Sequence, residues 1–171
     1  MVQILVSACL IGEPVRYNGK ALLLEHPQLR VWSEEGRLLA VCPEVLGGLC
    51  TPRSPSEIRD GDGNAVLQGK AIILNSSGDD MSQYFITGAR KALSIAVKHQ
   101  INTAILADGS PSCGSTYIYN GQFDGTRIAK DGVTAALFRQ HNIRVFSHLQ
   151  IDAAEKYVRQ LENRTASVLL A

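Results

Sequence analysis

Four cysteines are the residues of this sequence best suited to metal or nucleophilic chemistry. They are Cys9, Cys42, Cys50 and Cys113, and no two have the Cys-x-x-Cys spacing of zinc ribbons or ferredoxins. Four cysteines in 171 residues are too few for a disulfide-dense secreted scaffold, so we expect thiols, metal ligands or catalytic groups in a reducing compartment. If they bind one metal centre, the fold must gather them from distant loops.

The four cysteines lie in three short segments that also carry carboxylate, hydroxyl or guanidinium groups. The segments are Val6–Leu10 (Val-Ser-Ala-Cys-Leu), Val41–Arg53 (Val-Cys-Pro-Glu-Val-Leu-Gly-Gly-Leu-Cys-Thr-Pro-Arg) and Gly109–Ser115 (Gly-Ser-Pro-Ser-Cys-Gly-Ser). The loops around them are rich in glycine and proline, which lets the backbone approach a bulky inorganic ligand closely.

The elements that must position these segments are short apolar strands and amphipathic helices. Apolar runs rich in valine and isoleucine predict strands at Gln3–Ser7, Leu38–Val41, Ala71–Leu74, Thr103–Ala107 and Ile143–Phe146. Helical periodicity predicts helices at Asp79–Gln100, Gly132–His141 and Ile151–Asn163. We expect Gly78 and Asp79 to start the first helix, with Tyr84 and Phe85 in its buried stripe.

Strands that alternate with helices predict a single α/β domain, with a mostly parallel sheet flanked by helices in a Rossmann-like layering. Residues 1–150 would form the domain that carries the cysteines, and residues 151–171 its C-terminal helix and tail. In such sheets ligands bind beyond the carboxyl ends of the strands. Cys9, Cys42 and Cys113 each follow a predicted strand, so we expect them to meet at that edge.

The composition narrows the range of partners. The net charge of +1 gives no basic footprint for duplex nucleic acid, and no apolar stretch approaches the ~20 residues that span a bilayer. The first apolar run has no positively charged leader, so we interpret it as a buried strand and expect a cytoplasmic protein. The sequence does not predict an oligomeric state.

Together the three cysteine segments resemble a small bacterial family of TudS-like thiouracil desulfidases. The resemblance runs from about Gln3 to Ser147 and includes Arg16–Gly19, Gly61–Gly69, Phe85–Ala89 and Gly132–Leu137. It implies a [4Fe-4S] cluster bound by Cys9, Cys42 and Cys113, with one iron left without a protein ligand. It also implies non-redox removal of sulfur from a thiolated pyrimidine, such as 2- or 4-thiouracil or 4-thio-UMP, with release of hydrogen sulfide.

The resemblance and the residue types together suggest roles around the cluster. Glu44 is the candidate acid–base group, and Ser110, with Ser112 second, would orient water or substrate. Arg16 and Arg53 would bind a phosphate or a uracil carbonyl through charge-assisted hydrogen bonds. Cys50 departs from the family pattern, which more usually has proline there, and we expect it to be a bystander.

Other interpretations of the same residues remain open. The cysteines could form a structural or sensory zinc or iron–sulfur module, and Cys113 could be a nucleophile if a base lay nearby. Glu44 could serve simply to favour the start of a helix, and the two serines could serve simply to form a turn. Arg53 could form a structural ion pair with Glu57. We expect the Gly61–Asn64 segment to be a glycine-rich turn, and His26, His99, His141 and His148 to lie away from the cysteine loops.

Overall fold

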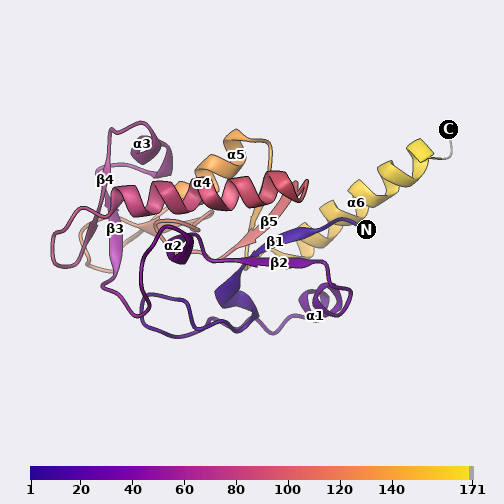
Figure 1. Ribbon diagram of the computed structural model, residues 1–171, viewed down its shortest axis with the longest axis horizontal. Helices are drawn as coiled ribbons and strands as arrows, with labels where there is room; N and C mark the ends of the chain where they lie inside the picture. The colour runs from indigo at the N-terminus through magenta and orange to yellow at the C-terminus, as the bar shows by residue number, and fades with distance from the viewer. Residues whose placement is uncertain (170–171) are drawn as a thin grey trace.

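Four parallel strands form the central sheet of the molecule (Figure 1). The computed structural model describes residues 1–169, with side chains to residue 164. The strands follow the order β2-β1-β5-β8, and they are β1 (Ile4–Ser7), β2 (Leu38–Val41), β5 (Thr103–Leu106) and β8 (Arg144–Ser147). Because neighbouring strands are parallel, their carboxyl ends share one edge of the sheet. The predicted α/β class is confirmed.

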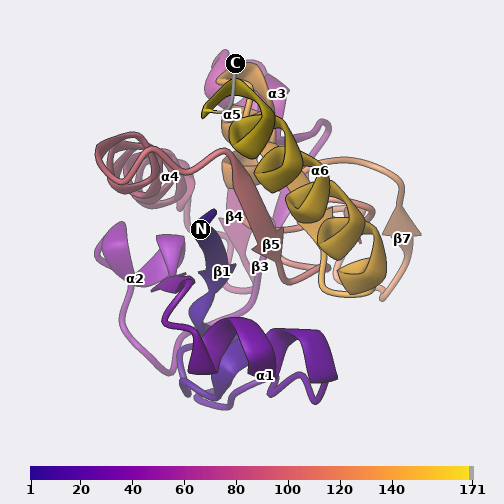
Figure 2. The same cartoon turned by 90° about the vertical axis from the view of Figure 1, so that its right-hand side faces the viewer.

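Helices cover both faces of this sheet, which explains why its strands are apolar throughout (Figure 2). Alternate side chains such as Val6 and Ile105 pack with α1 (Pro27–Glu34) and α6 (Ile151–Leu169). The intervening side chains, such as Leu5 and Leu106, pack with α4 (Ser82–Lys98) and α5 (Val133–Gln140). The core is therefore two apolar layers with the sheet between them.

Helix α4 begins three residues later than the sequence predicts. Asp79 is not its cap, because its side chain accepts a hydrogen bond from the Asn75 amide and closes a turn before the helix. Asp80 accepts from the Ser82 N–H instead. The buried stripe is confirmed at Phe85, whereas Tyr84 is 45% exposed and lies outside the core.

A second, antiparallel sheet pairs β3 (Ser56–Arg59) with β4 (Ile72–Asn75), and α3 (Gly63–Leu67) lies between them in sequence. The predicted strand at Ala71–Leu74 therefore lies outside the parallel sheet. Strand β3 escaped prediction because Ser-Glu-Ile-Arg has only one apolar residue. The Glu57 carboxylate is buried there and accepts the N–H groups of Gly121 and Phe123, so the interpretation of Glu57 as a partner of Arg53 is wrong.

Several short elements complete the fold and were not predicted. They are the 3-10 helix η1 (Ala8–Ile11) and the paired strands β6 (Ile118–Tyr119) and β7 (Arg127–Ile128), besides α1, α3 and β3. Helix α2 (Pro43–Leu46) has Glu44 in its first turn, which agrees with the alternative interpretation of Glu44 as a residue that favours a helix start. Helix α6 starts at the predicted residue and continues to Leu169, while residues 170–171 of the predicted tail lie outside the described residues. No helix among the described residues is long and apolar enough to cross a membrane.

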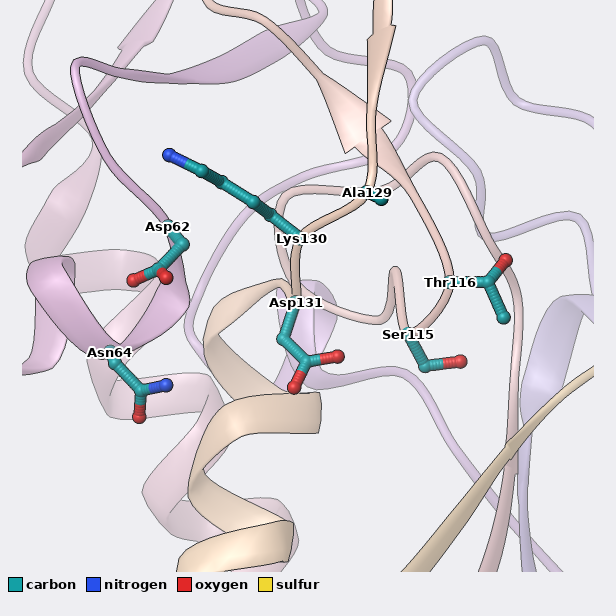
Figure 3. Close-up of a pocket in the computed structure, with 7 residues that line it drawn as sticks. All are labelled: Asp62, Asn64, Ser115, Thr116, Ala129, Lys130 and Asp131. Carbon is teal, nitrogen blue, oxygen red and sulfur yellow. The ribbon is translucent and has the colours of Figure 1, made fainter.

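An acidic pocket of about 280 Å³ lies beside α3 and the start of α5 (Figure 3). The residues that line it are Asp62, Asn64, Ser115, Thr116, Ala129, Lys130 and Asp131. Asp62 caps α3 by accepting the Ala65 N–H, so its segment is a helix start and not only a glycine-rich turn. Asp131 pairs with Arg139 at 3.0 Å, and burial raises the pKa of the Asp131 carboxyl in spite of this pair.

Candidate active site

The structure brings three of the four thiols to the carboxyl edge of the parallel sheet. Cys9 lies on η1 directly after β1, Cys42 lies between β2 and α2, and Cys113 lies in the loop after β5. The three strands are adjacent in the sheet. The thiols influence one another electrostatically, since Cys42 raises the pKa of Cys9, and Cys42 and Cys9 both raise that of Cys113.

All three thiols have a raised pKa, with burial as the largest cause. Burial and the neighbouring Cys42 raise the pKa of Cys9 to about 11, and burial also raises the pKa of Cys42. The pKa of Cys113 is well above its ordinary value, although a hydrogen bond with Ser7 opposes the shift. Three thiolates beside Glu44 therefore need a positive centre to balance them, and bound metal ions supply such a charge.

Close packing of α2 on α4 fixes the segment that carries Cys42 and Glu44. A Cβ atom on Gly47 would stand 2.1 Å from the Tyr84 carbonyl oxygen, and one on Gly88 would stand 1.9 Å from that of Pro43. Only glycine lets the two backbones approach this closely. The short helix α2 is thus seated on a long, rigid one, and its first turn cannot shift without displacing α4.

The loop that carries Cys113 is fastened to the start of α5. The N–H groups of Gly132, Val133 and Thr134 donate to carbonyl oxygens of this loop at 2.7, 2.8 and 2.9 Å. These are N–H groups that a helix start leaves without intrahelical partners. The loop carbonyls satisfy them, so the helix orders the backbone on either side of Cys113.

Asp108 fastens the same loop to the end of β8. Its carboxylate accepts the N–H groups of Ser115 and Thr116 at 2.8 and 2.9 Å, and the hydroxyls of Thr116 and Ser147. Burial opposes ionisation of Asp108, but these hydrogen bonds prevail and lower its pKa. Sequence reasoning missed this residue, although an aspartate directly after a buried strand, at the ligand-binding edge, was a usable signal.

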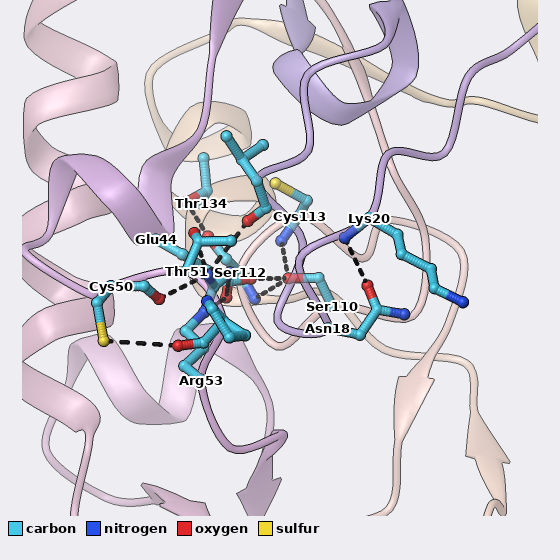
Figure 4. A network of polar contacts seen from close by, with 12 residues as sticks. Asn18, Lys20, Glu44, Cys50, Thr51, Arg53, Ser110, Ser112, Cys113 and Thr134 are labelled. Carbon is cyan, nitrogen blue, oxygen red and sulfur yellow. Dashed lines mark hydrogen bonds and ion pairs between the residues drawn. The ribbon is translucent and has the colours of Figure 1, made fainter.

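Glu44, Ser110 and Arg53 form a polar network beside the thiols (Figure 4). The Ser110 hydroxyl donates to Glu44 Oε1 at 2.8 Å and accepts the N–H groups of Ser112 and Cys113. Arg53 donates to Glu44 Oε2 through Nε at 2.9 Å and also through Nη2. The Glu44 side chain is only 14% exposed, so this carboxylate is largely withdrawn from water and held by two partners.

Arg53 is engaged by protein groups on every side. Besides Glu44, its guanidinium donates to the carbonyl oxygens of Val15 and Cys50 and to the Thr51 hydroxyl, each at 3.1 Å. Its side chain is 8% exposed. The residue therefore links the loop after β1 with the loop after α2 and holds Glu44 in place.

The side chains of Ser112, a predicted site residue, and Cys50, an expected bystander, lie in contrasting environments. Ser112 is completely buried, and its hydroxyl shares a hydrogen bond of 2.7 Å with that of Thr134 on α5. Cys50 is exposed, and its thiol lies 3.6 Å from the Pro52 carbonyl oxygen. Burial against α5 suits a packing role for Ser112, and exposure suits a bystander role for Cys50.

Arg16 and His148 lie at the same edge, the first of them as predicted. The positive charge of Arg16 opposes the rise in the pKa of Cys9 and adds to the fall in the pKa of His148. His148 follows β8, and its Nδ1 accepts the Asp108 N–H at 3.1 Å. The expectation that His148 lies away from the cysteine loops is wrong, because the parallel pairing of β8 with β5 returns it to their edge.

The donor set suits an iron–sulfur cluster better than a single ion. No three His, Cys, Asp or Glu side chains among the described residues are placed to hold one metal ion. A four-iron cluster is larger, and its usual ligands are cysteine thiolates. Three thiols that follow neighbouring strands, next to a hydrogen-bonded carboxylate and hydroxyl, are a set of side chains that suits an α/β enzyme with a metal cluster.

Comparison with known proteins agrees with this class. The chain belongs to the 2-thiouracil desulfurase family, whose model matches residues 4–150. A solved structure of the [4Fe-4S]-dependent thiouracil desulfidase TudS superposes with a TM-score of 0.86 and is 42% identical, covering 94% of this chain and 99% of that one. The uncharacterized protein YbbK of Bacillus subtilis (strain 168) is 44% identical over 149 residues, 87% of this chain and 97% of its own length.

Proposed function

We propose that this protein is a desulfidase that replaces the sulfur of a thiolated pyrimidine with oxygen. The reaction consumes one water, forms a C=O bond in place of C=S, and releases hydrogen sulfide, so no electron donor or acceptor is needed. The observation that carries the proposal is the meeting of three thiols at one sheet edge beside the Glu44–Ser110 pair. Membership of the 2-thiouracil desulfurase family supports it.

Cys9, Cys42 and Cys113 are the proposed ligands of a [4Fe-4S] cluster. When bound, such a cluster supplies an iron without a protein ligand, which acts as a Lewis acid with affinity for the substrate sulfur. The chain's own contribution is the fixed position of the three thiols. Their loops are held by η1, by the α2–α4 contact and by the start of α5.

Glu44 is the proposed general base, and later the general acid. A water placed against its carboxylate would lose a proton to Glu44 as it adds to the ring carbon, and Glu44 would return that proton to the departing sulfur or ring nitrogen. Ser110 orients the carboxylate through Oε1, and Arg53 holds it through Oε2. Ser112 remains a weaker catalytic candidate, because its hydroxyl faces Thr134.

Arg16 is the proposed substrate-binding group of the two predicted arginines. Its guanidinium makes no hydrogen bond or ion pair with the described residues, whereas that of Arg53 is occupied by Glu44 and three other partners. A guanidinium without a partner near the cysteines suits an anionic or carbonyl oxygen of the substrate. The substrates that we propose are 2- and 4-thiouracil and 4-thio-UMP.

Anaerobic purification followed by iron and sulfide analysis tests the cofactor, and a spectral assay tests the reaction. We expect about four irons per chain, loss of the thiocarbonyl absorbance of at least one substrate, and an equal amount of hydrogen sulfide. A protein that takes up no cluster on reconstitution and leaves all three substrates intact would refute the proposal. A loaded cluster with no turnover on any of them would favour a structural or sensory module instead.

A further inference from the structure

A tight turn in the loop after β1 carries Arg16, the proposed substrate-binding residue. The Arg16 N–H donates to the Lys20 carbonyl oxygen at 3.2 Å, and the Arg16 carbonyl oxygen accepts the Gly19 N–H at 2.8 Å. We call this segment, Val15–Lys20, the Arg16 turn. Its own hydrogen bonds give the turn its shape, but they do not fix its position relative to Glu44, which lies on α2.

Arg53 fastens the Arg16 turn from the loop after α2. Its Nη1 donates to the Val15 carbonyl oxygen at 3.1 Å, and its backbone N–H donates to the Tyr17 carbonyl oxygen at 2.8 Å. These two carbonyl groups belong to the residues on either side of Arg16. One residue therefore holds the backbone both before and after Arg16, through its side chain and its main chain.

Another edge of the same guanidinium holds Glu44 (Figure 4). Nε donates to Glu44 Oε2 at 2.9 Å, and Nη2 donates to the same oxygen. Because the two side chains are only 8% and 14% exposed, the pair is largely shielded from water and interacts more strongly than a surface pair would. Further contacts of Nη1 with the Cys50 carbonyl oxygen and the Thr51 hydroxyl engage almost every N–H of the guanidinium, which leaves little of it for a substrate.

We propose that Arg53 is a positioning residue that couples the Arg16 turn to Glu44, so that the substrate-binding loop and the acid–base group keep one relative position. The inference rests on the proposed desulfidase function, in which Arg16 binds the substrate and Glu44 transfers the proton. A planar guanidinium directs donors to several sides in a fixed geometry, whereas a lysine ammonium is one compact charge. The reacting groups must be held in register for an efficient reaction, and this bridge supplies that constraint.

Amide hydrogen exchange of the anaerobically purified protein tests the coupling without any turnover. Arg53→Gln and Arg53→Lys should each speed exchange at the Arg16 and Gly19 amides about tenfold, the effect of losing one hydrogen bond from a charged donor. Glu44→Ala should speed exchange at the same amides, because it frees the guanidinium, although Glu44 makes no hydrogen bond with the turn among the described residues. Unchanged exchange in the turn of Glu44→Ala, or of both Arg53 variants, would overturn the coupling.

Kinetics of the cluster-loaded enzyme at equal iron content separate the two contacts of Arg53. Arg53→Gln should lower kcat and raise KM about tenfold each. Arg53→Lys keeps a positive charge beside Glu44, so it should recover most of kcat while KM stays raised. On a Glu44→Gln background, Arg53→Gln should lower kcat no further, because the carboxylate that it positions is already gone.

Matched controls and the two kinds of measurement separate the outcomes. Arg90 is exposed on α4, so Arg90→Gln and Arg90→Lys should behave as the wild type in both exchange and kinetics. An equal loss of kcat from Arg53→Gln on both backgrounds, or a KM that Arg53→Lys restores, would overturn the coupling. A wild-type protein without turnover would refute the desulfidase function, whereas the exchange result tests the coupling in either case.

Discussion

The loop from Asp108 to Thr116 separates two polar regions that differ in how their side chains are used. On one side, Cys113 lies with Cys9 and Cys42, and Ser110 donates to Glu44. On the other, Ser115 and Thr116 line the acidic pocket of Asp62 and Asp131. Both regions contain buried or half-buried titratable groups with a raised pKa, so burial alone does not distinguish a reactive site from a structural one.

The two regions differ in how many of their polar groups already have partners. In the acidic pocket Asp62 caps α3, Asp131 pairs with Arg139, and the Lys130 ammonium donates to the Gly61 carbonyl oxygen at 3.3 Å. At the cysteine edge Glu44 is paired with Arg53, but the three thiols, whose pKa values are raised, and the Arg16 guanidinium have no ionic partner among the described residues. Groups that the fold itself leaves unbalanced are the ones available to a cofactor or a substrate.

The largest expected effect comes from removing one thiol from the cysteine edge. Cys9→Ser, Cys42→Ser and Cys113→Ser should each lose the cluster and with it all desulfidase activity, because an alcohol is a poor ligand for iron–sulfur centres. Iron and sulfide analysis of anaerobically purified protein measures this. Cys50→Ser is the matched control and should retain both. Loss of the cluster from the Cys50 variant alone would show that the ligand assignment is wrong.

A smaller but still large effect is expected from neutralising one carboxylate in each region. Glu44→Gln should keep its cluster and lose about 10²- to 10⁴-fold in kcat, the usual contribution of a general acid–base group. Asp131→Asn makes the same chemical change in the acidic pocket and should leave kcat unchanged. Steady-state assays of the two variants at equal iron content compare their kcat values. Full activity in Glu44→Gln would remove its catalytic role.

Asp108 fastens the loop that lies between the two regions, and its contribution to the free energy of unfolding should depend on pH. Hydrogen bonds lower the pKa of Asp108 in the folded state. The carboxylate therefore stabilises the fold at any pH above its unfolded pKa of ~3.9, and this stabilisation is lost as the pH falls through the folded pKa. Asp108→Asn should lower the free energy of unfolding by about 1–2 kcal/mol at neutral pH and by less in acid. The range allows for the weaker electrostatics of a half-exposed carboxylate. Urea unfolding of metal-free protein from about pH 3 to 7 measures this. A penalty independent of pH would contradict it.

The smallest effect is expected at the cap of α3. Asp62→Ala removes the acceptor for the Ala65 N–H and should lower the free energy of unfolding by about 1 kcal/mol. Asp62→Asn keeps a capping oxygen and should lower the free energy of unfolding by at most a few tenths of 1 kcal/mol. Neither variant should change desulfidase kinetics. A fall in activity with either would show that the acidic pocket contributes to the reaction.

The sequence by itself determined the class of fold and the edge at which the thiols meet. Apolar runs such as Leu38–Val41 predict strands buried on both faces, and cysteines after such strands gather at their carboxyl ends. The periodic stripe of α4 was also readable, although its first turn was not, because Asp79 closes a turn with Asn75. The local pattern of apolar residues is enough to predict an element wherever that element buries apolar side chains along its whole length.

Only the tertiary structure decided which polar groups are engaged and which are left open. Arg16 and Arg53 are alike in sequence terms, yet contacts from Glu44 and three other groups occupy only Arg53. His148 and Asp108, 40 residues apart, meet because β5 and β8 pair in parallel. The physical reason is that hydrogen bonds and electrostatic neighbours depend on distances between strand ends, and these are set by strand order and register, which no local pattern encodes.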